Sequence, residues 1–292
     1  MSTQAVGIVA ALLSAGAWAV GAVLYKKFGE RISSVGMNLA KGVINVVLFA
    51  LTLSVIGYAP MSVDSFLLLG ISGIIGIALG DTLFFEALQK LGPQVLVVLS
   101  MLGQVLTALF ALFFLGESLS PAMWAGMALV IGGIAYVVAT RSTGATRKNT
   151  AAGLLCGLGA VLAMSVSVVL AKEGMTDVSA VQATFVRMLW GTAGLLLWGG
   201  VRGGIGAWME PFREVRLAGR FFFLVCLVSF GGFWLFHVAI KYTEVAVATT
   251  LSSTEPLFVI PLAAIFLKER VTGRMMLGTA IAVAGIVLLS NG

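Results

Sequence analysis

The sequence predicts an all-α integral membrane protein, with ten transmembrane helices arranged as two inverted five-helix repeats. The chain of 292 residues is 60% hydrophobic and only 10% charged, and its mean hydropathy is +1.08. Soluble proteins carry about 25% charged residues, so this chain has too few to cover a surface that faces water. Its apolar residues gather in runs near the ~20 residues that cross a bilayer. In addition, the two halves of the chain match each other.

Ten apolar runs are separated by short segments of charges and turn residues. They fall at roughly 5–26, 34–56, 65–88, 93–115, 121–140, 151–172, 178–200, 218–240, 245–267 and 272–290. Only residues 89–92 separate the third run from the fourth, so we expect a tight hairpin there. The first run is too long for a signal peptide, and no basic region precedes it, so it is expected to stay as a span.

The two longest polar gaps are residues 141–150 and 201–220. The first lies near the midpoint of the chain and is the expected linker between the halves. The second contains Trp208 and four arginines, a composition typical of an amphipathic segment at the membrane surface.

The halves align at two offsets. A shift of 146 residues places Lys41 on Arg187, and a shift of 152 places Phe114-Leu115-Gly116-Glu117 on Phe266-Leu267-Lys268-Glu269. We therefore expect a first repeat over 1–140, a linker over 141–150 and a second repeat over 151–292. Five helices is an odd number, so the second repeat enters the membrane inverted. Transporters often have this design, with the substrate site near the midplane between repeats.

Several motifs occur in this order and spacing: Gly80-Asp81-Thr82-Leu83-Phe84-Phe85-Glu86-Ala87-Leu88, Leu115-Gly116-Glu117-Ser118-Leu119, Ser253-Thr254-Glu255-Pro256-Leu257-Phe258 and Leu267-Lys268-Glu269-Arg270-Val271. With them the whole chain resembles the EamA-like branch of the drug/metabolite transporter superfamily. That resemblance implies export or exchange of amino acids, metabolites, nucleotide-linked sugars or drugs. The fourth run departs from the pattern, because it has Gly103-Gln104 where the ninth has Glu255-Pro256.

The charge pattern indicates membrane orientation rather than nucleic-acid binding. The net charge is +6, and nearly all Lys and Arg lie between the apolar runs. Cys156 and Cys226 lie inside apolar runs and His237 is the single histidine, so neither a disulfide framework nor a multi-histidine metal site is expected. No cofactor is expected, and no nucleotide-binding motif indicates ATP drive.

Lys and Arg are distributed unevenly between the loops. Even-numbered loops carry Lys172 and Lys241, whereas odd-numbered loops carry Lys26, Lys27, Arg31, Lys90, Arg141, Arg147, Lys148, Arg202, Arg213, Arg216, Arg220, Lys268, Arg270 and Arg274. The positive-inside rule then places both termini outside. The resemblance implies both termini in the cytoplasm, so the two predictions conflict. The expected location is the inner (plasma) membrane of a bacterium, as a multi-pass protein.

Ionisable residues within spans are costly, and they usually face a partner or a cavity. The spans contain Lys41, Asp81, Glu86, Arg187, His237 and Glu255. Lys41 and Asp81 lie at similar depths from one face, and Arg187 and Glu255 from the other. Two pairs are therefore expected, either as structural ion pairs or as the lining of a substrate cavity. Paired charges would suit a zwitterion or weak cation, whereas free Lys41 and Arg187 would suit an anion.

The ninth run contains the leading expected substrate contact. Pro256 and Pro261 remove backbone donors, which frees carbonyl groups at membrane depth. The neighbouring polar residues are Ser252, Ser253, Thr254 and Glu255. Glu255 is also the best candidate for a proton carrier. The alternative interpretation of this segment is a packing kink.

Weaker indications come from the first, third and eighth runs. Trp18 and Trp234 either line a cavity for a flat apolar solute or face lipid, and His237 is either a proton relay or an interface residue. Gly70-Ile71-Ser72-Gly73 matches an intramembrane serine-protease motif, so Ser72 with His237 gives an enzyme alternative. A non-transporting membrane subunit is a further alternative. The expected function is secondary transport of an amino acid or similar small solute by alternating access, without enzyme activity and with the substrate and a coupled proton as partners.

Overall fold

The computed structural model describes residues 3–114, 120–139, 147–175, 178–242, 251, 254–269 and 271–291. These residues are almost entirely helical, and no strand occurs among them. Five helical segments within them are long and apolar enough to cross a membrane: Ala5–Phe28, Ser34–Ile56, Val63–Leu91, Pro121–Ala139 and Thr150–Ala171. Shorter apolar helices cover Pro93–Leu106, Glu255–Leu267 and Gly273–Leu289. The all-α membrane fold is therefore confirmed, and the count of ten spans stays a prediction.

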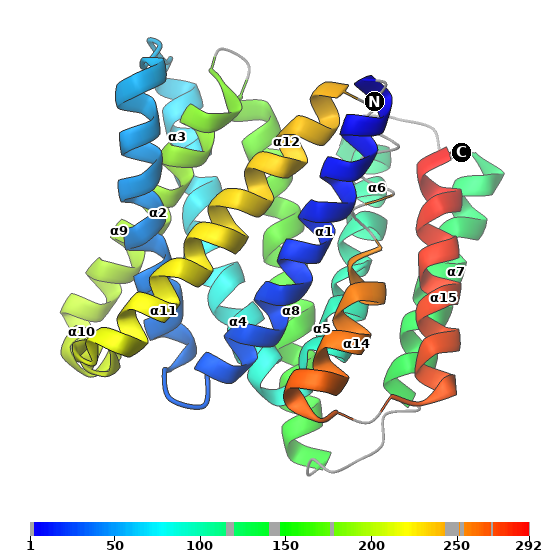
Figure 1. Cartoon of the computed structure of the whole chain (residues 1–292). Helices are drawn as coiled ribbons and strands as arrows, with labels where there is room; N and C mark the ends of the chain where they lie inside the picture. Colours follow the sequence, from blue (N-terminus) through cyan, green and yellow to red (C-terminus); the bar gives the residue numbers. More distant parts are fainter. Residues whose placement is uncertain are drawn as a thin grey trace. The chain divides into compact units, whose positions relative to one another are not determined.

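The helices follow the predicted runs closely (Figure 1). Before the midpoint they are α1 Thr3–Phe28, α2 Ser34–Ile56, α3 Val63–Gly73, η1 Ile74–Asp81, α4 Thr82–Leu91, α5 Pro93–Ser100, α6 Leu102–Phe114 and α7 Pro121–Ala139. After it come α8 Arg147–Gly174, α9 Ala180–Arg202, α10 Ile205–Met209, η2 Glu210–Arg213, α11 Val215–Val225, η3 Cys226–Gly231, α12 Gly232–Tyr242, α14 Glu255–Leu267 and α15 Gly273–Asn291. Segments η1 and η3 are π-helices, and η2 is a 3₁₀-helix.

Two polar gaps are more helical than hydropathy indicated. Helix α8 begins at Arg147, inside the predicted linker 141–150, whose residues 141–146 lie outside the described part. The segment 201–220 contains α10, η2 and the start of α11. Hydropathy marks where the apolar run ends, but the helix continues through polar turns that the hydropathy profile does not detect.

Hydroxyl side chains begin several of these helices. Ser33 Oγ accepts a hydrogen bond from Gly36 N at 3.1 Å, and Ser179 Oγ accepts one from Gln182 N at 3.2 Å. Ser120 and Thr272 cap α7 and α15 in the same way. Each cap satisfies a backbone N–H that has no partner within the first turn of its helix.

The predicted hairpin between the third and fourth runs is present. Helix α4 ends at Leu91, Gly92 has a φ of 80°, and Pro93 opens α5. Glycine is required at this φ because a side chain would be strained there, and proline suits the first helical turn.

Element bounds recur at the offsets found in the sequence. Helices α2 and α9 both have 23 residues and begin 146 residues apart, at Ser34 and Ala180. Helices α7 and α15 both have 19 residues and begin 152 residues apart. The two π-helical segments also begin 152 residues apart, at Ile74 and Cys226.

The helices form two compact units. Unit 1 comprises Met1–Lys27, Lys90–Leu154 and Leu227–Gly292, and unit 2 comprises Phe28–Gln89 and Leu155–Cys226. Each unit thus combines segments from before and after the chain midpoint.

In unit 1, α7 and α15 lie side by side (Figure 1). A Cβ atom on Gly126 would lie 2.8 Å from the Gly285 carbonyl oxygen, and one on Gly133 would lie 2.6 Å from that of Gly278. The residue numbers of the contacting glycines fall along α15 as they rise along α7, so the two helices are antiparallel. Only glycine lets the two backbones approach this closely.

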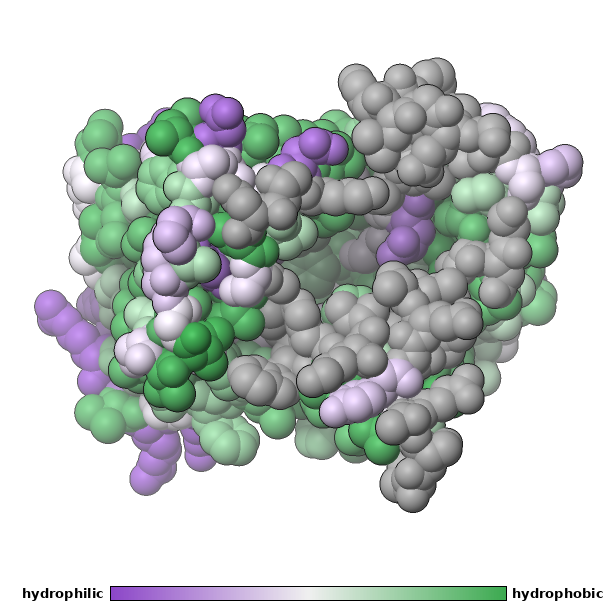
Figure 2. All heavy atoms as spheres, turned by 90° about the horizontal axis from the view of Figure 1, so that it is seen from above, coloured by the Kyte–Doolittle hydropathy of each residue, from purple (hydrophilic) through white to green (hydrophobic). Residues whose placement is uncertain are grey.

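In unit 2, α3, α8 and α9 share a core of Leu69, Ala171, Ala183 and Val186, with Trp190 packed against it. Outward-facing side chains are also apolar: Val55 is 85% exposed and Val201 is 88% exposed. Viewed from above, hydrophobic residues cover most of the coloured surface, with hydrophilic residues in a few places (Figure 2). A lipid environment explains such exposure, because lipid tails solvate apolar side chains.

Candidate functional site

One face of α2 carries the main polar cluster of unit 2. Asn38, Lys41 and Asn45 follow at intervals of three and four residues, which places them on the same side of the helix. All three are buried, and both asparagines are fully so. The face packs near η1, whose carbonyl groups and carboxylate supply its partners.

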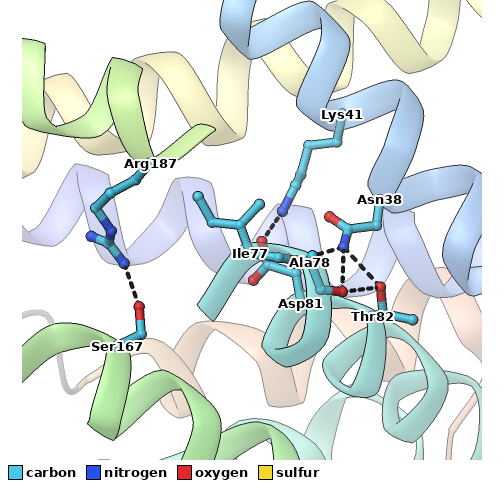
Figure 3. Close-up of polar contacts among 8 residues, drawn as sticks. All are labelled: Asn38, Lys41, Ile77, Ala78, Asp81, Thr82, Ser167 and Arg187. Carbon is cyan, nitrogen blue, oxygen red and sulfur yellow. Dashed lines mark hydrogen bonds and ion pairs between the residues drawn. The ribbon is translucent and has the colours of Figure 1, made fainter. Parts of the chain in front are cut away.

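Lys41 and Asp81 form an ion pair between α2 and the end of η1 (Figure 3). The Lys41 side chain is 10% exposed and the Asp81 side chain 20% exposed. Lys41 Nζ also lies 5.3 Å from the centroid of the Phe85 ring, within the range of a cation–π contact. The structure thus contains the first expected pair, and its role toward a solute stays a prediction.

Asn38 bonds to the π-helical segment. Its Nδ2 donates to the Ile77 carbonyl oxygen at 2.7 Å and to Thr82 Oγ1 at 2.9 Å (Figure 3). Thr82 Oγ1 in turn donates to the Ala78 carbonyl oxygen at 2.6 Å. A π-helical turn departs from the regular α-helical ladder, and such turns are frequent at functional sites. Asn38 and Thr82 together satisfy carbonyl groups of that turn.

Ser72 on α3 and Ser167 on α8 bond to each other reciprocally. Ser72 Oγ donates to the Ser167 carbonyl oxygen at 2.7 Å, and Ser167 Oγ donates to the Ser72 carbonyl oxygen at 2.8 Å. Both residues are fully buried. The Ser72 hydroxyl proton is therefore committed to a backbone acceptor, an arrangement that ties two helices together.

Arg187 extends from α9 toward Ser167 (Figure 3). Its Nη2 donates to Ser167 Oγ at 2.9 Å, and its Nε is buried without a hydrogen-bond partner among the described residues. No carboxylate of the described part of unit 2 pairs with it. The expected pair of Arg187 with Glu255 would join residues of different units and stays a prediction.

Further polar atoms buried in unit 2 have no hydrogen-bond partner among the described residues. They are Asn38 Oδ1, Asn45 Oδ1, Asn45 Nδ2 and Thr192 Oγ1. Buried polar atoms are normally satisfied, so a group of exceptions calls for an explanation. In a membrane interior such atoms need a polar partner, because lipid offers none.

Glu86 lies on α4, five residues beyond Asp81. Ser34 Oγ, from the first turn of α2, donates to Glu86 Oε2 at 2.8 Å. The contact links the start of α2 to α4, so that Asp81 and Glu86 both bond to α2.

The remaining expected residues lie in unit 1. Glu255 opens α14, where Pro256 occupies the first turn, and Pro261 lies inside the helix. A first turn tolerates proline without distortion, and the expected helix break at Pro256 and Pro261 stays a prediction. Thr254 Oγ1 donates to the Leu251 carbonyl oxygen at 2.6 Å.

Trp18 on α1 packs against Phe236 with ring centroids 5.7 Å apart. Ser252 and Ser253 lie outside the described residues, and Trp234 and His237 are described only by the backbone of α12.

Sequence reasoning missed Asn38, Asn45, Ser167 and Thr192. A search confined to ionisable residues passes over amides and hydroxyls, although their desolvation in a membrane is also costly. The polar residues spaced three and four apart around Lys41 were the available signal.

Comparison with known proteins identifies the family to which this chain belongs. The model of the EamA-like transporter family matches residues 5–139 and again 151–291. A protein of Archaeoglobus fulgidus named "Uncharacterized transporter" is 27% identical over 286 residues, which cover 97% of each chain. "UDP-galactose translocator 1" of Caenorhabditis elegans is 34% identical over 112 residues, 37% of this chain and 29% of that protein.

A similar fold is found among solved crystal structures, of which one covers nearly the whole chain. Its TM-score is 0.60 at 17% sequence identity, with 98% of this chain and 95% of the other covered.

The protein is thus a multi-pass membrane transporter. It belongs to the EamA-like transporter family, within the drug/metabolite transporter superfamily.

Proposed function

We propose that the protein is a secondary transporter of an amino acid or similar small organic solute, which it exports or exchanges across the inner membrane of a bacterium. One observation carries the proposal. Charged and polar side chains from α2, η1, α8 and α9 are buried together within segments that are otherwise apolar. Such groups are expensive in a membrane and are typical of a solute pathway.

We further propose that the chain contains two inverted repeats, over 1–140 and 151–292. The equal lengths of α2 and α9 support this proposal, as do those of α7 and α15 at the other offset. The antiparallel contact of α7 with α15 also supports it, because an inverted duplication relates equivalent helices by opposite directions. Alternating access then follows as the mechanism, with a solute that binds the two states unequally.

Substrate contacts are proposed at Lys41, Asp81, Arg187 and Glu86 in unit 2, with Glu255 as the proton carrier. The relatives support transport as a class. The C. elegans protein is named for UDP-galactose, but the match covers just over a third of this chain, so its substrate is not carried over.

Counterflow in proteoliposomes tests the proposal. Vesicles containing the purified protein would be loaded with pooled amino acids, organic cations or anionic metabolites, and uptake of a labelled member of each pool would be measured. We expect exchange with one pool, and loss of its pH dependence in Glu255→Gln. Glu173→Gln, an exposed carboxylate in the last turn of α8, is the matched control and should behave as the native protein. Absence of exchange with every pool, from protein shown to be folded, would contradict the proposal.

The enzyme alternative rests on Ser72 with His237. The Ser72 hydroxyl donates to the Ser167 carbonyl oxygen, so it lacks a general base as its acceptor in this structure. Family membership likewise favours transport.

A further inference from the structure

Unit 2 places two cations around one carboxylate. Lys41 is in contact with Asp81, whereas Arg187 is near enough to interact with Asp81 electrostatically without forming a pair. With both cations charged and Asp81 ionised, these three groups carry a net positive charge. Glu86, five residues along the chain from Asp81, is bonded to Ser34 at the start of α2.

The two halves of the chain explain why Arg187 has no acidic partner among the described residues of unit 2. Arg187 lies 146 residues after Lys41, at the equivalent place on the equally long helix α9. The residue 152 positions after Asp81, at the offset that relates the two π-helical segments, is Phe233. The second half therefore keeps the cation of the pair and has an aromatic residue in place of the carboxylate.

The guanidinium group of Arg187 has unused donor capacity. It carries five N–H donors in a planar fork, of which the structure uses one toward Ser167. Gly76 lies beside this contact, since a Cβ atom there would lie 2.1 Å from Ser167 Oγ, the atom that accepts from Arg187. An unpaired buried charge is destabilising, and a carboxylate matches the fork in shape and charge.

We propose that Arg187 binds the carboxylate of the transported solute, so that the substrate is a small organic acid or an amino acid. The inference rests on the proposed function and names the substrate class of the same site. Lys41 already contacts Asp81, so a carboxylate on the solute would supply the counter-charge that Arg187 does not receive from the described residues of unit 2.

Thermal unfolding of the purified protein in detergent tests the assignment with acetate as the probe. Sodium acetate should raise the melting temperature in a saturable manner, whereas acetamide and sodium chloride at equal ionic strength should not. Arg187→Gln should raise the half-saturating acetate concentration by about tenfold or more, the loss expected for a charge-assisted hydrogen bond. Arg202→Gln, on the exposed last turn of the same helix, should leave the acetate response unchanged.

Three results would overturn the proposal: equal stabilisation by acetamide, an acetate response that persists in Arg187→Gln, or stabilisation by phosphate alone. If Arg187→Gln does not fold, Arg187→Lys replaces it, and its acetate response should weaken while that of Arg202→Lys does not. An acetate response without counterflow would contradict transport and leave the anion site standing. Counterflow of a solute without a carboxylate would contradict this inference alone.

Discussion

Ser72 and Ser167 hold α3 against α8 through two crossed hydrogen bonds, each hydroxyl donating to the backbone carbonyl of the other residue. The two Oγ atoms are also 3.1 Å apart, so the two hydroxyl groups contact each other directly. Ser167 Oγ also accepts from Arg187, so this pair positions the guanidinium group as well as the helices.

Removal of either hydroxyl should destabilise the protein unequally. Ser72→Ala loses one side of the exchange, and a cost of about 1–2 kcal/mol is expected. Ser167→Ala should cost more, because it also removes the acceptor for Arg187. The double variant should cost less than the sum of the two, since the residues share the same bonds. Unfolding in detergent measures all three, and strict additivity would show that the bonds are energetically independent.

Variants of Lys41 and Asp81 can distinguish a structural role of this ion pair from a role in binding the solute. Lys41→Met should lower the free energy of unfolding by about 3–5 kcal/mol, because it leaves a mostly buried carboxylate without its cation. Lys41→Met combined with Asp81→Asn removes both charges and should recover much of that loss. Counterflow should stay absent in the double variant if the pair contacts the solute. Recovery of both stability and counterflow would show that the pair is structural only.

The close approach of α7 and α15 predicts opposite outcomes at neighbouring glycines. Gly133→Ala should destabilise the protein by about 1–3 kcal/mol, because its Cβ atom would lie 2.6 Å from the backbone of α15. Gly132→Ala meets nothing within 4 Å and should be neutral or slightly stabilising, since alanine favours a helix. Melting temperatures of the two variants give the comparison, and equal losses would contradict the described contact.

A surface pair in unit 2 should make stability depend on pH. Arg31 donates to Glu214 at 2.5 Å, and this hydrogen bond lowers the pKa of Glu214 from its ordinary value of 4.5. A depressed pKa stabilises the folded state above the ordinary pKa, and the benefit disappears as pH falls through the lowered value. Glu214→Gln should therefore lower the melting temperature slightly at pH 7, and this difference should shrink as pH falls below 4.5 and disappear below the lowered pKa of Glu214.

Both side chains of this pair are about half exposed, so added salt should also reduce the difference. Glu210→Gln is the control, because Glu210 is exposed and forms no ion pair with a described residue. A pH-independent loss in Glu214→Gln would indicate a packing effect instead.

Much of the fold was predictable because the membrane restricts the possibilities. A run such as 34–56 becomes α2 because the backbone in lipid satisfies its polar groups only within a helix or a closed barrel. The Lys41–Asp81 pair was predictable from depth counted along two helices. The π-helical turns at Ile74 and Cys226 were not, because hydropathy does not report how a turn is hydrogen-bonded.

The contacts of Ser167 and Arg187 could not be predicted from the sequence, because they depend on which helices pack against each other. Which helix faces Ser167, and whether Arg187 reaches it, are set by the packing of α3, α8 and α9. The sequence offsets align Lys41 with Arg187 but do not reveal that, among the described residues of unit 2, Lys41 has an acidic partner and Arg187 has none.

The π-helical segments at Ile74 and Cys226 also bear on ancestry. A π-turn arises when one residue is inserted into an α-helix, an event that is unlikely to be fixed twice at matching positions. Under the proposed duplication, the insertion therefore predates the gene fusion. Each five-helix half would then have carried the widened turn from the start, so the turn would be as old as the helices that it interrupts.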